Sequence, residues 1–196
     1  MGSKKTNQRY SRFRFDAGSL SLNYVATVRH RGSWPRDLLA APEALSDWLR
    51  LAGLVTDPIS LSSEEHKEAL LLREAIHDTV RFVISDQKSS HEDIDRINRA
   101  ARFRVAVPQW DRSAHRILWA TFDPLKACLA VIARDTITLM GDLTKNHLKM
   151  CASDSCRMLF VDASPAHRRR WCAMSLCGNR RKVAMHRQRQ RETNHK

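Results

Sequence analysis

Apolar residues recur every three or four positions through much of the chain before residue 142, and this spacing predicts a series of amphipathic helices. Five are expected, beginning near residues 19, 42, 62, 91 and 124. Residues typical of helix termini mark several boundaries: Ser19, Pro42, Ser62 and Pro124 at starts, and Gly53 and Gly141 at ends. Ser62 and Glu65 have the spacing of a capping box, which predicts a long helix after them.

Short segments of strand character predict a few strands beside these helices. Residues 12–15 alternate between arginine and phenylalanine and are one candidate. Residues 103–107 and 117–121 are expected to pair as a hairpin around a turn at 108–113. Further on, 158–161 and 168–171 are expected to form a second hairpin, and Ser175 is expected to cap a final helix.

Charge divides the chain unevenly. The formal net charge is +13, yet residues 1–144 hold 21 Lys and Arg against 18 Asp and Glu. Residues 145–196 hold 13 against 3. Such a split predicts a nearly neutral body that carries a small unit facing a polyanion.

No apolar run is long enough for a transmembrane helix, and the N-terminus lacks the apolar stretch of a signal peptide. We therefore expect a cytoplasmic protein with no membrane partner. Thiols stay reduced in that compartment, which favours metal binding by cysteine over disulfide formation.

Four of the five cysteines form two pairs of equal spacing, C-x4-C-x15-C-x4-C. Thiolates are ligands that zinc prefers, and four of them can close a tetrahedron around one structural ion. The predicted zinc ligands are Cys151, Cys156, Cys172 and Cys177. The alternative is four ordinary buried thiols, and His147, His167 or His186 could replace one cysteine. Arg157, Arg168 and Arg180 are expected to offset the negative charge of the site.

The expected fold class is therefore α+β: a mostly helical trunk with a small β-hairpin or sheet, followed by a C-terminal treble-clef-like zinc finger. The expected boundaries are a disordered basic N-terminus at 1–12, a trunk at 13–145, and a finger with a basic C-terminal helix at 146–196. Cys177 is expected in the first turn of that helix. Loss of zinc should unfold the finger and spare the trunk.

The segment 170–180 closely resembles the signature of the CGNR zinc-finger family, which takes its name from the string found here at 177–180. Residues 15–18, 22–28 and 45–54 resemble the ABATE domain that usually precedes this finger. The resemblance implies a bacterial stress-induced transcription regulator whose finger binds DNA. Where the family tends to show Asp-Phe-Val-Asn-Thr, this chain has Asn23 to Thr27. The resemblance thus implies Asn23 and Thr27 as candidate ligand-binding residues, in a site that this departure alters or removes.

A basic helix after Ser175 is expected to supply the contacts to nucleic acid. Arginine binds guanine edges in the major groove, and neighbouring cations hold phosphates. The candidate nucleic-acid-binding residues are Arg168, Arg169, Arg170, Asn179, Arg180, Arg181, Lys182, Arg187 and Arg191. Asn179 could read adenine, but its place beside a ligand favours bracing the zinc loop. Two alternatives remain at this point: a solvated tail without a partner, or RNA stacked on aromatic residues such as Trp171.

The leading functional prediction is a zinc-binding transcription regulator whose finger contacts DNA. Its N-terminal domain would sense a small-molecule effector or mediate homodimerisation. The alternative is a protein-interaction module whose basic helix docks on an acidic partner, with only nonspecific affinity for nucleic acid. No nucleophile–base arrangement with defining spacing is found, so we do not expect an enzyme.

Overall fold

The computed structural model describes residues 12–142 and 147–193. It confirms the fold class, a mostly helical trunk with small antiparallel strand pairs followed by a four-cysteine unit. The helices are α1 (Leu20–Val25), α2 (Pro42–Leu51), α3 (Ser63–Ile84), α4 (His91–Ala101), α5 (Pro124–Asp142) and α6 (Asn179–Thr193). A π-helical turn, η1 (Met174–Gly178), precedes α6. The expected disordered start and the expected boundary at 145 lie almost entirely outside the described residues.

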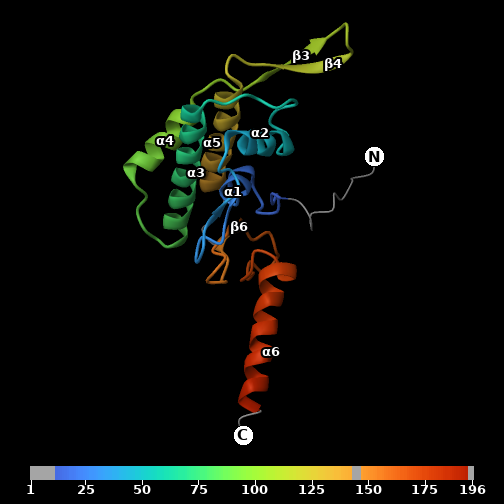
Figure 1. Cartoon of the computed structure of the whole chain (residues 1–196). Coiled ribbons are helices and arrows are strands. Elements are labelled where there is room, and N and C mark those ends of the chain that lie inside the picture. Colours follow the sequence, from blue (N-terminus) through green and yellow to red (C-terminus); the bar gives the residue numbers. More distant parts are fainter. Residues whose placement is uncertain (1–11, 143–146, 194–196) are drawn as a thin grey trace.

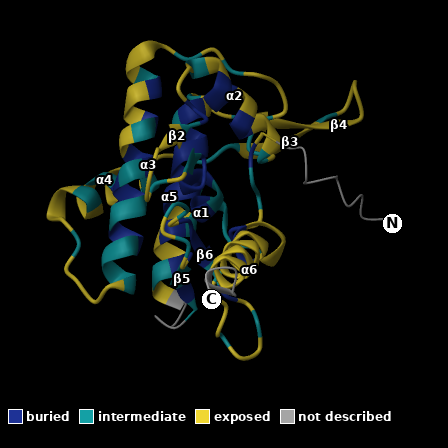
Figure 2. Ribbon diagram, turned by 60° about the horizontal axis from the view of Figure 1, so that its bottom comes forward, coloured by how far each residue is buried: buried dark blue, intermediate teal, exposed yellow. Residues whose placement is uncertain are grey.

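The trunk is built around the long helix α3, which packs on α4, α5 and the short α1, while α2 crosses at one end (Figure 1). Trp48 of α2 and Tyr24 of α1 are fully buried and meet at 4.9 Å between ring centroids. The Tyr24 hydroxyl donates a hydrogen bond to the Ala69 carbonyl of α3 at 2.7 Å. Buried segments therefore gather along the centre of the trunk, and α4 contributes only Ile97 to it (Figure 2).

The helix starts confirm the sequence prediction because capping is a local interaction. The Ser19 hydroxyl accepts a hydrogen bond from the Leu22 amide at 3.2 Å. Ser62 and Glu65 form the reciprocal bonds of a capping box at the start of α3. No helix within the described residues is long and apolar enough to cross a membrane.

The strands only partly match the prediction. The first predicted hairpin is present as β3 (Val107–Asp111) and β4 (Arg116–Ala120), but its turn lies at 112–115, because Pro108 takes a place within the strand. Residues 12–15 form no strand: Phe13 is buried and the segment runs irregularly along the trunk. The two-residue strands β1 (Val28–Arg29) and β2 (Arg36–Asp37) pair around the segment predicted as a loop.

The finger packs directly on the trunk. Its strands β5 (Leu148–Met150) and β6 (Leu159–Val161) pair with each other and contact α3, and β6 also contacts α1. The Val161 amide donates to the Ala17 carbonyl at 2.8 Å. Gly18 approaches so closely that a Cβ there would lie 2.7 Å from the Val161 Cβ. Leu159 and Phe160 therefore belong to the same buried core as the trunk helices.

Candidate metal centre and basic helix

The four predicted cysteine ligands come together at one point. Their sulfur atoms all lie within 4.8 Å of one another. The Sγ of Cys172 lies 3.8 Å from the Sγ of Cys156 and 3.8 Å from that of Cys177. A tetrahedron with zinc–sulfur bonds of about 2.3 Å has sulfur–sulfur edges of about 3.8 Å. The donor set and its spacing therefore fit one tetrahedral zinc ion.

The charge of this cluster calls for a cation. All four thiols are free, and only Cys156 is more than slightly exposed. Burial, and then the neighbouring sulfur charges, raise the pKa of Cys177 to about 11. A dication removes this repulsion and lets all four thiolates form together. A closed set of four thiolates leaves no position for a catalytic water, which is typical of a structural site.

Each cysteine pair is held by its own local structure. The Cys151 amide donates to the Met158 carbonyl at 2.8 Å, which closes the first loop against the start of β6. The Cys172 amide points at the Cys151 sulfur, 3.5 Å away. Cys177 lies in η1, where a Cβ on the next residue, Gly178, would overlap the Met174 sulfur. A larger residue at this position of the CGNR string would therefore displace the Met174 side chain beside the ligand.

Two local predictions for this region are wrong. Residues 168–171 form no return strand, because β5, just before Cys151, pairs with β6 instead. The Arg169 amide is bound by the Asp162 carboxylate at 2.8 Å, so it is not available to a strand ladder. Ser175 does not cap a helix, since η1 begins one residue earlier with Ala173 at the cap position. Cys177 thus lies in a π-helical turn just before α6.

Asp162 organises the loop between the cysteine pairs. It is fully buried, and its carboxylate also accepts the Ser164 amide at 3.0 Å. Burial alone would raise the pKa of Asp162, but the hydrogen bonds from Ser164 and from the Arg169 amide lower it to about 2. The His167 ring approaches the Asp162 carbonyl at 2.8 Å and stacks on His147 at 4.0 Å. Neither histidine joins the cysteine cluster, which among the described residues contains cysteines alone.

Arg14 contacts the metal centre from the other end of the chain, which the sequence analysis did not predict. Its guanidinium donates to the Cys172 sulfur at 3.3 Å and binds Asp16 through two nitrogens at 2.7 and 2.6 Å. Arg157, one of the arginines expected to offset the charge of the site, ion-pairs with Asp154 at 3.8 Å. No local signal marks Arg14, because 158 positions separate it from Cys172.

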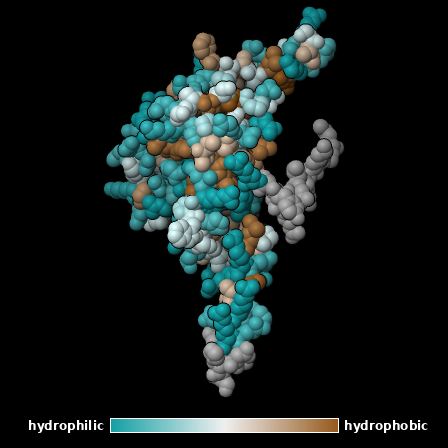
Figure 3. Space-filling model, in the orientation of Figure 1, coloured by the Kyte–Doolittle hydropathy of each residue, from teal (hydrophilic) through white to brown (hydrophobic). Residues whose placement is uncertain are grey.

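The basic helix α6 extends from the metal centre away from the trunk (Figure 1). Every residue from Asn179 to Arg191 is exposed. The helix carries six basic residues: Arg180, Arg181, Lys182, Arg187, Arg189 and Arg191. Its surface is accordingly hydrophilic along most of its length (Figure 3). An exposed helix that carries this many cations has a surface suited to a partner.

The arginines before the second cysteine pair lie partly beside this helix. A cavity of about 400 Å³ brings Arg170 and Trp171 together with Arg180 and Arg181. Arg168 is exposed. The Arg169 side chain contacts the finger itself: it donates a hydrogen bond to the Cys172 carbonyl at 2.7 Å and lies over the Phe160 ring.

The two candidate ligand-binding residues in the trunk are engaged in the fold. The Asn23 side chain accepts the Ala17 amide at 3.0 Å. Thr27 is buried, donates to the Tyr24 carbonyl at 2.6 Å and accepts from Arg73 at 3.2 Å. Both side chains stabilise the segment between α1 and β1, and a ligand for them stays a prediction.

Comparison with known families agrees with this geometry. Residues 147–190, which contain all four cysteines, match the CGNR zinc finger. Residues 18–143 match ABATE, described as "Putative stress-induced transcription regulator". The chain belongs to the ABATE family. A search of the curated proteins found no match. In this ABATE protein the two matched segments share one core, and Arg14, which precedes both, contacts the metal centre.

Proposed function

We propose that this ABATE protein is a zinc-dependent DNA-binding transcription regulator, in which α6 lies against the DNA. The observation that carries the proposal is the helix itself: six cations on a helix that is exposed from Asn179 to Arg191 and follows a closed four-cysteine cluster. Fifteen residues at 1.5 Å per residue give about 22 Å of helix, enough to follow the major groove. Trunk sensing of an effector stays a prediction.

The positive charge of α6 supports a polyanion as the partner more directly than it supports a folded acidic protein. Each phosphate that the protein neutralises releases counterions. A plot of the logarithm of the binding constant against the logarithm of the salt concentration therefore has a slope of about −0.9 per phosphate contact. Arg180, Arg187 and Arg191 share one face of α6, and three phosphate contacts from that face predict a slope near −3. Arg170, with its guanidinium over the Trp171 ring, lies beside the first turn of α6 and extends the positive surface.

The test is a fluorescence anisotropy titration of labelled duplex DNA with the zinc-loaded chain, repeated with Arg180→Ala/Arg187→Ala. The matched control, Arg96→Ala/Arg99→Ala on α4, removes the same charge from the trunk. We expect the α6 variant to bind at least tenfold more weakly and to lower the salt slope by about 2. Equal losses in both variants would overturn the proposal, because net charge alone would then explain binding. Retention of a tight protein complex without duplex affinity would favour the protein-interaction alternative.

A further inference from the structure

The hairpin of β3 and β4 projects from the trunk at the end opposite α6 (Figure 1). We call residues 107–120 the arm. In the antiparallel register, Pro108 pairs with Trp119 and Trp110 pairs with Ile117. Because side chains alternate between the two faces of a strand, these four residues share one face. That face carries no charged or polar side chain, and we call it the apolar face.

No part of the chain within residues 12–142 and 147–193 covers the apolar face. Trp110, Ile117 and Trp119 expose 64%, 57% and 56% of their surfaces, and Phe122 at the root of the arm is fully exposed. Aromatic side chains present about 150–250 Å² each. The exposed parts of Trp110, Ile117, Trp119 and Phe122 together leave roughly 600 Å² of largely apolar surface in water. Monomers rarely expose contiguous apolar patches beyond a few hundred Å².

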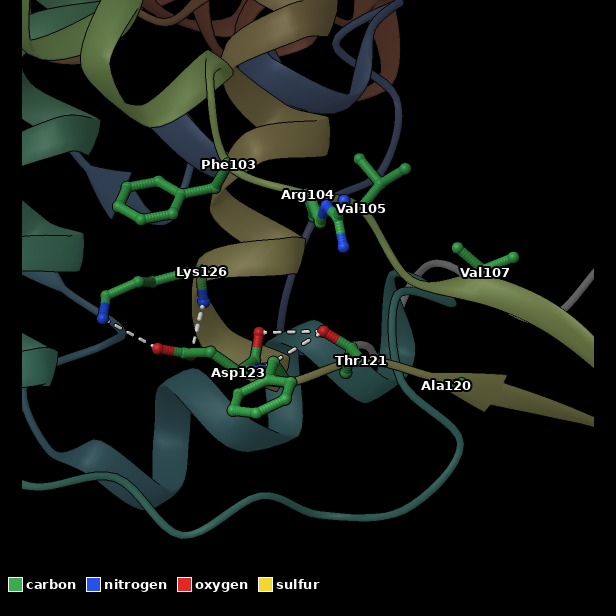
Figure 4. A pocket seen from close by; sticks show the side chains of 9 residues that line it. Phe103, Arg104, Val105, Val107, Ala120, Thr121, Asp123 and Lys126 are labelled. Carbon is green, nitrogen blue, oxygen red and sulfur yellow. Dashed lines mark hydrogen bonds and ion pairs between the residues drawn. The ribbon is translucent and has the colours of Figure 1, made fainter.

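A groove beside the arm enlarges this surface. A cavity of about 470 Å³ lies between β4 and the segment 54–59, with Ile117 and Trp119 among its walls and Val55 and Ile59 among the others. A second cavity, of about 650 Å³, lies at the root between Phe103 and Lys126 (Figure 4). The arm therefore presents an apolar face and, next to it, a largely apolar recess on the same molecule.

We propose that the arm is a dimerisation element, in which its apolar face packs against the same face of a second copy of this chain. A standard protein interface buries about 800 Å² on each partner, and the apolar face together with Phe122 supplies most of that area. An isologous contact about a twofold axis uses the same patch on both copies. The apolar face and its adjoining recess on one copy would therefore contact the same face and recess on the other.

Other occupants fit the face less well. Residues 1–11, 143–146 and 194–196 are mostly polar in sequence and supply little apolar surface to cover it. A nucleic acid would require cations on the contacting face, and the apolar face has none. Strand addition at the edge of β3 is hindered by Pro108, which lacks an amide donor. The face, and not the edge, is therefore the docking surface, and the contact does not depend on DNA binding by α6.

Sedimentation of the full zinc-loaded chain over a range of concentrations tests the proposal. We expect a species of twice 22.6 kDa that dissociates on dilution. Trp110→Ser/Trp119→Ser should weaken association by about 100-fold or more, as central aromatic residues of an interface do. Trp34→Ser is the matched control, because Trp34 is 88% exposed in the loop between β1 and β2 and should leave the dimer intact.

Folding of the variants is checked by zinc content and thermal unfolding, which the exposed substitutions should leave close to wild type. A wild-type chain that stays monomeric at every concentration would overturn the proposal. So would a dimer that survives the double substitution, because the contact would then lie elsewhere. Open-ended association, or single-stranded nucleic acid binding that is lost with the two tryptophans, would also replace the proposed dimer contact.

Discussion

Replacement of Arg14 by alanine is expected to weaken zinc binding by about 10- to 100-fold. The Arg14 side chain is only 10% exposed, and its guanidinium lies 3.3 Å from the Cys172 sulfur. A hydrogen bond to a charged group contributes about 1.5–3 kcal/mol. Each 1.4 kcal/mol is a tenfold change in a binding constant, and partners of metal ligands typically have effects of this size.

The assay is competition for zinc between the protein and a chromophoric chelator at constant pH. Arg157→Ala is the matched control, since Arg157 follows a cysteine ligand directly but pairs with the exposed Asp154. Surface ion pairs contribute about 0–1 kcal/mol, so this variant should lose less than about fivefold. Zinc affinity of Arg14→Ala within twofold of wild type would refute the reasoning. An equal loss in Arg157→Ala would refute it too, because proximity in sequence would then matter more than the contact.

Three further predictions concern the joint core and its ion pairs. Gly32→Ala should destabilise the fold by about 1–3 kcal/mol in urea unfolding, because the added Cβ would overlap the Asp154 carbonyl oxygen. Gly141→Ala is the control and should not destabilise the fold, since its Cβ would enter open space within a helix. Asp37→Asn should cost about 1–3 kcal/mol at neutral pH. Burial raises the pKa of Asp37, but hydrogen bonds from Arg73 lower it overall from its ordinary value of 3.8, so the difference from wild type should shrink as the pH falls below 3.8 through the lowered pKa. Chelation of the zinc should lower the protection of α3 amides against hydrogen exchange as well as destabilise the finger, and unchanged protection in α3 would argue against a shared core.

Local interactions explain what could be predicted from the sequence. The caps at Ser19 and Ser62 act within one helical turn, so their residue types were enough to place α1 and α3. The four cysteines were identified because few other roles suit two matched thiol pairs beside a basic segment. Their convergence follows from the donor chemistry that zinc requires.

Long-range contacts explain what could not be predicted. The partner of β6 is decided by packing on α3, and nothing within 158–171 indicates that β5 would displace the predicted return strand. Arg14 looked like part of an alternating strand, and its contact to Cys172 exists only after the whole chain has folded. The shared core likewise depends on Gly18 and Gly32, whose close approaches to the finger leave no pattern in the sequence. The shared core leads us to predict that zinc loss also destabilises the trunk, and the expectation that the trunk is spared stays untested.

The most direct test of DNA binding by α6 is selection from a pool of genome-fragment duplexes by the zinc-loaded chain over a salt series. The account predicts that discrete fragments are retained as salt rises, and that retention disappears in Arg180→Ala/Arg187→Ala. Uniform binding of all fragments that vanishes by physiological salt would contradict it, because α6 would then act only as a nonspecific cation.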